Sequence, residues 1–144
     1  MATQRPSPKS KARRVALNQA RYVVKSERSK NLDRAFATEL GELYRGDCLD
    51  LLAGLKSESV DLVFADPPFN LNKKYRSQIN DNILEHKYLD WTRSWLVECA
   101  RVLKPGGSMF VWNLPRWNYR AASMLDGVLT FRHWIAVDIK YCLP

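Results

Sequence analysis

The sequence predicts an α/β fold, because short apolar runs alternate along the chain with segments of helical periodicity. Residues 60–65 (VDLVFA) form a mostly apolar run of the kind that is buried in a parallel sheet. Between about 85 and 103, apolar residues recur at steps of three and four, which indicates a long amphipathic helix. A second apolar run at 108–112 follows it. This order predicts a mainly parallel sheet with right-handed crossover connections.

The other elements follow from the same patterns and from turn residues. Lys104-Pro105-Gly106-Gly107 should end the long helix, because proline cannot continue a helix and glycine accepts left-handed dihedrals. The Trp91 and Trp95 side chains within that helix are expected in the core. The remaining expected elements are a strand at 42–45, a turn at 46–47, a helix at 47–55, a helix at 115–125 with proline in its first turn, and a last strand at 131–139.

Cysteine content and hydropathy exclude several classes of protein. The three cysteines, Cys48, Cys99 and Cys142, are far apart and form no cluster with histidine, so the sequence suggests neither a disulfide framework nor a metal site. Apolar runs are strand-sized and shorter than the roughly 18 to 20 residues that span a bilayer. No membrane association is expected, and a reducing cytoplasm fits best.

Two acidic residues follow predicted strands at their carboxyl ends. Asp66 begins the tetrapeptide Asp66-Pro67-Pro68-Phe69 directly after the strand at 60–65, and Asp47 follows the strand at 42–45. Because ligands of parallel α/β sheets bind beyond the carboxyl ends of the strands, both acids are expected to face the same crevice. Asp47 could instead serve only as the N-cap of its helix.

The tetrapeptide suits chemistry on a planar exocyclic amine, whose lone pair is delocalised and therefore a poor nucleophile. The Asp66 carboxylate and the Pro67 carbonyl can each accept one N–H, which aims the lone pair at an electrophile. The prolines fix φ and remove competing donors, so the acceptors are preorganised. Phe69 offers a flat face for an unstacked base, and a base within a duplex must be flipped out to reach it.

The segment 44–75, followed by a long helix and Lys104-Pro105-Gly106-Gly107, resembles the beta group of DNA adenine-N6 and cytosine-N4 methyltransferases. The resemblance covers about residues 41–144 and implies a Rossmann-like fold that uses S-adenosylmethionine. By this resemblance Asp66, Pro67, Pro68 and Phe69 are catalytic, and Asp47 with Cys48 lies near the cofactor. Phe69 stands where tyrosine is more frequent. Asp66, where cytosine enzymes more often have serine, favours adenine.

Basic residues are expected to contact DNA. Lys73, Lys74 and Arg76 follow the tetrapeptide, a position that suits phosphate contacts beside a flipped base. The formal charge of +8 resides in residues 1–34, which are expected to be a flexible tail. Within this tail only residues 12–28 could be helical. Residues 35–144 are neutral overall and are expected to form a partial catalytic domain. The tail could add salt-dependent DNA affinity or only solubility.

The resemblance also predicts what the sequence lacks. None of the six glycines forms the G-x-G turn expected for the methionine part of the cofactor. That turn follows a central strand, so the sheet is expected to be incomplete, with a gap between the strands that end before Asp47 and Asp66. The chain would be a truncated enzyme, or half of a split one completed by a C-terminal segment or second subunit. A non-catalytic DNA-binding remnant, or modification of RNA or a protein amide, remains an alternative. Asn113 could line the crevice or cap the helix at 115–125.

Overall fold

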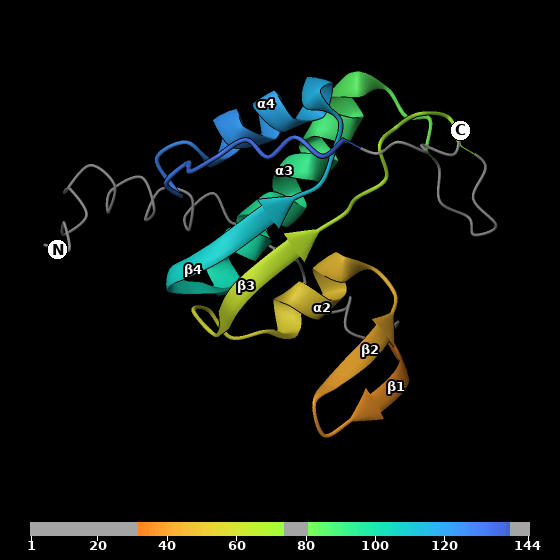
Figure 1. Ribbon diagram of the computed structural model, residues 1–144. Helices are drawn as coiled ribbons and strands as arrows, with labels where there is room; N and C mark the ends of the chain where they lie inside the picture. Colours follow the sequence, from red (N-terminus) through yellow and green to blue (C-terminus); the bar gives the residue numbers. More distant parts are fainter. Residues whose placement is uncertain (1–31, 74–80, 139–144) are drawn as a thin grey trace, which may run out of the picture.

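The computed structural model describes residues 32–73 and 81–138 (Figure 1). Most of the basic tail, the possible helix at 12–28, Lys74 and Arg76 lie outside the described residues. The described elements are β1 (Asp33–Thr38), β2 (Gly41–Arg45), α2 (Cys48–Gly54), β3 (Val60–Ala65), α3 (Glu85–Val102), β4 (Leu103–Val111) and α4 (Pro115–Leu125). The predicted α/β class is confirmed, and β1 begins at Asp33, before the expected end of the tail.

The expected single, mainly parallel sheet is wrong for the described residues, which form two separate two-stranded sheets. β1, which the sequence did not predict, pairs antiparallel with β2, and β3 pairs parallel with β4. The two-residue connection at Glu39 and Leu40 makes pairing of β1 with β2 entropically inexpensive, because the loop to be closed is short. β2 therefore pairs within a hairpin and not with the sheet that precedes Asp66.

The β3–β4 pair contains a bulge at the glycines. Val60 is opposite Leu103, but Leu62 is opposite Ser108, so residues 104–107 lie outside the regular ladder. Gly106 has a φ of +85°, and a Cβ at Gly107 would lie 2.9 Å from the Asp61 carbonyl oxygen. The helix ends at Val102, close to the expected point. The strand begins earlier than expected because it includes this bulge.

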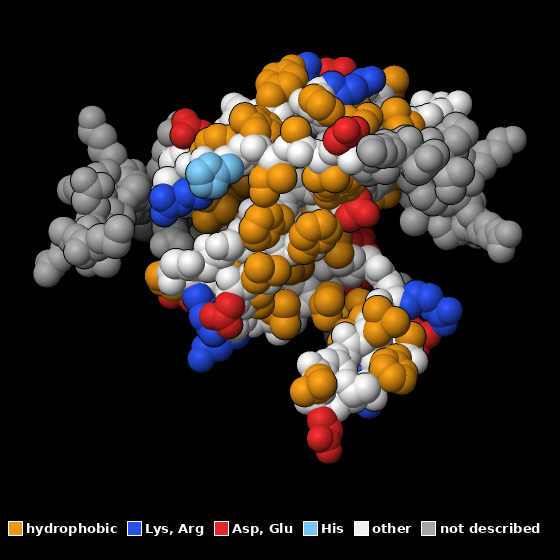
Figure 2. All heavy atoms as spheres, in the orientation of Figure 1, with side chains coloured by type: hydrophobic (Ala, Val, Ile, Leu, Met, Phe, Trp, Pro, Cys, Tyr) orange, Lys and Arg blue, Asp and Glu red, His pale blue; other side chains and the backbone are white. Residues whose placement is uncertain are grey.

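α3 and α4 cover one face of the β3–β4 sheet and form the core with it (Figure 1). Trp95, Leu96, Cys99 and Ala121 are buried there, and Trp91 packs against them, which confirms the expected core role of both tryptophans. The opposite face is exposed: Leu62, Phe64 and Phe110 are 55%, 64% and 42% accessible. Figure 2 shows apolar side chains gathered over this part of the molecule. The expectation that the run at 60–65 is buried in the sheet is wrong for this face, because no described element covers it.

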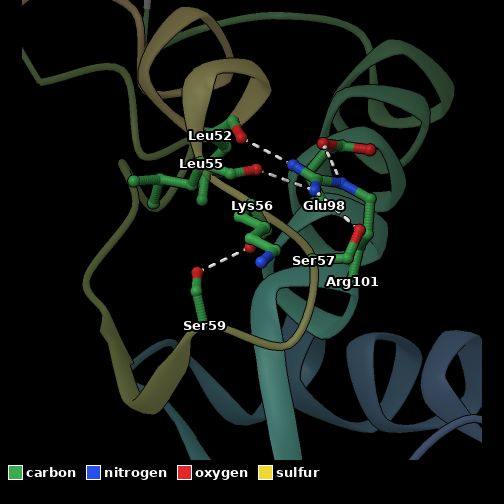
Figure 3. Close-up of polar contacts among 7 residues, drawn as sticks. All are labelled: Leu52, Leu55, Lys56, Ser57, Ser59, Glu98 and Arg101. Carbon is green, nitrogen blue, oxygen red and sulfur yellow. Dashed lines mark hydrogen bonds and ion pairs between the residues drawn. The ribbon is translucent and has the colours of Figure 1, made fainter.

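Hydrogen bonds from Arg101 connect α3 to the end of α2 (Figure 3). The Arg101 guanidinium donates to the carbonyl oxygens of Leu52 and Leu55 at 2.6 and 2.9 Å, and it pairs with Glu98 at 2.8 Å. The last carbonyls of a helix lack partners within it, so this cation satisfies the carboxyl end of α2.

The expected strand at 131–139 is absent over the described residues 131–138, which are exposed and irregular. The segment is rich in residue types that favour strands, namely Phe131, Trp134, Ile135 and Val137. However, β propensity largely reflects the packing of side chains on a sheet. This segment pairs with no neighbouring strand in the described structure. Within the described residues, no helix is both long and apolar enough to cross a bilayer.

Candidate active site

The tetrapeptide Asp66–Phe69 leaves the sheet directly after β3. The Trp112 N–H donates to the Ala65 carbonyl oxygen at 2.8 Å, just beyond the paired residues Ala65 and Val111. The next residue, Asp66, is exposed, and the three that follow are half-buried. The acid is therefore at the carboxyl end of a parallel strand, as the sequence predicts.

Hydrogen bonds restrain the second half of this tetrapeptide from two helices. The Tyr88 hydroxyl of α3 donates to the Pro68 carbonyl oxygen at 2.7 Å. The Trp117 indole Nε1–H of α4 donates to the Phe69 carbonyl oxygen at 2.8 Å. Both aromatic side chains are almost fully buried, so their positions are defined by the core.

Other acceptors of the tetrapeptide remain available. In the described part of the chain, the Asp66 carboxylate and the Pro67 carbonyl oxygen have no hydrogen-bond partner. Pro67 and Pro68 have no backbone N–H that could compete for them. These are the two groups that the sequence analysis assigned to an exocyclic amine.

The Tyr88 hydroxyl both donates and accepts. It donates to Pro68 and accepts from Asn113 Nδ2 at 3.0 Å. Burial raises the pKa of Tyr88, so this hydroxyl keeps its proton and remains a donor at neutral pH. The Asn113 side chain therefore points to Tyr88. The α4 N-cap residue is Leu114, with no side-chain cap, so the alternative that Asn113 caps α4 is wrong.

A buried carboxylate organises the loop that follows the tetrapeptide. Asp81, 3% accessible, accepts the backbone N–H groups of Asn70 at 2.7 Å and of Leu71 and Lys73 at 3.0 Å. Asn70 adopts a φ of +56°, and its amide side chain makes two hydrogen bonds with the backbone of Ile83. The chain direction after Phe69 is thus fixed by hydrogen bonds to residues that lie 8 to 13 positions further along the chain.

The expected cofactor residues lie at the start of α2. Asp47 is the N-cap, and its Oδ1 accepts the Leu49 N–H at 2.9 Å, so the capping role is confirmed. Its carboxylate is exposed, and its second oxygen has no partner among the described residues. Desolvation raises the pKa of the neighbouring Cys48 thiol, with the Asp47 charge as a second cause, so that thiol is neutral.

Asp47 and Asp66 do not follow strands of one sheet, which differs from the expectation of a shared sheet edge. In Figure 1, however, α2 runs in the opposite direction to β3, so the start of α2 and the end of β3 are directed to the same end of the molecule. Of the expected DNA-contacting residues, Lys73 lies in the Asp81-bound loop and is exposed, and Lys74 and Arg76 are not described. No group of three potential metal ligands occurs in the described segments.

The residues that position the tetrapeptide were not predicted from the sequence. Tyr88 and Trp117 look like core aromatics, and Asp81 looks like one acid in a polar loop. The polar atoms of Tyr88 and Trp117 indicate that each side chain makes a hydrogen bond, because a buried Tyr or Trp usually has a hydrogen-bond partner. Which backbone oxygen each one finds depends on how α3 and α4 pack, and local sequence does not encode that.

Comparison with known proteins identifies the family to which this chain belongs. Residues 60–141 match a family model described as DNA methylase. The chain is 51% identical over 109 residues to the type II methyltransferase M.BamHI of Bacillus amyloliquefaciens, a match that covers 76% of this chain and 26% of that protein.

Two further relatives match over shorter segments. The DNA adenine methyltransferase YhdJ of Escherichia coli K12 is 41% identical over 78 residues, covering 54% of this chain and 26% of YhdJ. The type II methyltransferase M.HpaI of Haemophilus parainfluenzae is 42% identical over 65 residues, covering 45% and 20%. The match with this chain spans about a quarter of the length of M.BamHI and of YhdJ.

Proposed function

Since this chain belongs to the DNA amino-methyltransferase family, we propose that it carries the catalytic tetrapeptide of an enzyme that methylates adenine N6 in DNA. S-adenosylmethionine is the proposed donor, and when bound it supplies an electrophilic methyl group. The observation that carries the proposal is the pair of unpartnered acceptors, the Asp66 carboxylate and the Pro67 carbonyl. Their neighbours in the tetrapeptide are hydrogen-bonded to the core.

The two acceptors suit an amine that has two N–H bonds to donate. Accepting both holds the nitrogen in place and directs its lone pair away from Asp66 and Pro67, toward the methyl group. Transfer would break the bond between the methyl group and the donor sulfur and form the N–C bond, and the nitrogen would give up one proton, which the exposed Asp66 carboxylate can accept and pass to water. Half-buried Phe69 provides the face against which the base rests. A duplex base must leave the stack to reach this loop.

Other residues have supporting roles in the proposal. Asp47, with Cys48 beside it, contacts the nucleoside part of the donor. Lys73, Lys74 and Arg76 contact phosphates that flank the flipped base. The expected Rossmann-like arrangement, and completion of the site by a C-terminal segment or second subunit, belong to the same proposal. A DNA-binding chain without catalysis is the second outcome that the experiment below distinguishes.

The test is a fusion in which this full chain replaces the matched 26% of the Bacillus relative. We expect the purified fusion to methylate DNA, and mass spectrometry of digested nucleosides to show N6-methyladenine. N4-methylcytosine in its place would assign the chain to the cytosine enzymes. A folded fusion that binds DNA and methylates neither base would contradict the proposal, with the intact relative as positive control.

Asp66→Ala is the first variant to examine in this fusion. Loss of a preorganised acceptor costs about 10² to 10³ in rate, so we expect methyl transfer to fall below about a hundredth while DNA affinity is retained. Asp61→Ala is the matched control, because Asp61 lies on β3, the strand that leads into Asp66, but pairs with Lys104 at the surface. Equal rates in the two variants would exclude a catalytic role for Asp66.

A further inference from the structure

The backbone of the tetrapeptide is restrained at two adjacent carbonyls by two different helices. Tyr88 of α3 holds the Pro68 oxygen at 2.7 Å, and Trp117 of α4 holds the Phe69 oxygen at 2.8 Å. The rings of Tyr88 and Trp117 also contact each other, with centroids 4.7 Å apart. The two restraints therefore form one packed unit, which we call the aromatic clamp (Tyr88 and Trp117).

The clamp acts on two carbonyl oxygens and leaves a third free. Carbonyls of consecutive residues in an irregular loop all require partners, and water or substrate can supply them. With Pro68 and Phe69 engaged, the Pro67 carbonyl oxygen, like that of Asp66, has no partner among the described residues and can accept from a ligand. The clamp also opposes rotation of the Pro68 peptide group, because such a rotation would break the bond from Tyr88.

We propose that Tyr88 and Trp117 are positioning residues, which orient the Pro67 carbonyl and the Phe69 ring toward the substrate base. Asn113 is the third member, because its amide donates to the Tyr88 hydroxyl at 3.0 Å. This bond leaves Pro68 as the acceptor for the Tyr88 proton. The inference rests on the proposed function and extends it to residues that touch neither substrate nor donor.

A structural role alone makes a different prediction. If these bonds served only to stabilise the fold, their loss would lower the folded fraction and leave the turnover of each folded molecule unchanged. Misplacement of a reacting group by about 1 Å can cost 10²-fold in rate. Loss of this orientation should therefore lower kcat. DNA contacts outside the tetrapeptide should leave KM for DNA unchanged.

The kinetic test uses Tyr88→Phe in the active fusion that contains the full chain. This change removes one hydroxyl and keeps the ring in the core. We expect kcat, normalised to folded enzyme, to fall about 10- to 100-fold, and KM for DNA to stay within about twofold. Asn113→Ala leaves the hydroxyl in place and should show a smaller loss in kcat. Tyr119→Phe is the matched control, because that tyrosine is 56% exposed and bonds only Arg120 in the described structure.

A second readout does not depend on activity. The Trp117 indole N–H should exchange with solvent more slowly than that of Trp134, which is 60% exposed, in spectra of ¹⁵N-tryptophan-labelled protein. Rapid exchange at Trp117 would overturn the clamp as a structural feature.

The outcomes separate the inference from the proposed function. An active fusion in which Tyr88→Phe keeps wild-type kcat would overturn the inference and leave the proposed function intact. A wild-type fusion that methylates no base would remove both. A fall in kcat with unchanged KM, unchanged thermal stability and a protected Trp117 signal would support the clamp.

Discussion

Replacing Asp81 tests whether one buried carboxylate maintains the loop after the tetrapeptide. Asp81→Asn is nearly isosteric, so it changes hydrogen bonding and charge without leaving a cavity. In the native side chain Oδ1 accepts from Asn70, and Oδ2 accepts from both Leu71 and Lys73. Asparagine retains one acceptor oxygen and places an NH₂ group where the other oxygen was.

The cost follows from this change of partners. If the remaining oxygen keeps Asn70, the N–H groups of Leu71 and Lys73 face a donor. A buried group left without its partner costs about 1–3 kcal/mol, so two such groups give about 2–6 kcal/mol. Domains of this kind are stable by about 5–15 kcal/mol in total. The loop is local, so we expect the lower half of the range, with the loop opening before the core unfolds.

Two measurements test this reasoning. Urea denaturation gives the free energy of unfolding, and amide hydrogen exchange reports on Asn70 and Leu71 individually. Asp61→Asn is the control, since the Asp61 side chain is 80% exposed and its pair with Lys104 should contribute less than about 1 kcal/mol. If Asp81→Asn costs no more than Asp61→Asn and leaves exchange at Asn70 unchanged, the assignment of Asp81 is refuted.

Two other predictions concern the stability of the domain. In urea denaturation, Arg101→Met should destabilise it by about 2–3 kcal/mol, because the Leu52 and Leu55 carbonyls lose a charged donor. The control is Arg120→Met, which breaks an exposed pair with Glu85 and should cost less than about 1 kcal/mol. Burial raises the pKa of Cys99 to about 12. The folded state therefore keeps this proton where the unfolded state, with a thiol pKa near 9, loses it. Stability should fall as pH rises above 9, by up to about 1.4 kcal/mol per unit, and a Cys99→Ala variant with an equally steep alkaline loss would contradict this cause.

The sequence predicted the elements whose patterns are strong. Long helical periodicity placed α3 within a residue or two, and the proline and glycines at 104–107 marked the irregular segment that follows it. The carboxyl end of β3 placed Asp66 correctly. These features depend on local periodicity and on backbone dihedrals, which short stretches of sequence encode.

Pairing partners were not predictable in the same way. β1 (DRAFAT) has no clear alternation, and the connection at Glu39 and Leu40 is not a typical hairpin turn sequence, so the hairpin went unrecognised. Conversely, residues 131–138 have strand-forming side chains but no neighbouring strand. The same distinction between local and long-range features applies to the residues of the candidate site. The Asp66–Phe69 motif is contiguous and readable, whereas its supports come from residues 81, 88, 113 and 117, brought together only by folding.

The parallel pairing of β3 and β4 also has a consequence during synthesis on the ribosome. Ala65 is paired with Val111, so β3 is not fully paired until 46 more residues have been made. At about 5–20 residues per second, that interval lasts roughly 2–9 s. Throughout it, the apolar side chains of β3 and their unpaired backbone are available to other nascent chains. A translational pause between α3 and β4 would lengthen this exposure, and faster decoding of that stretch should raise the yield of folded protein.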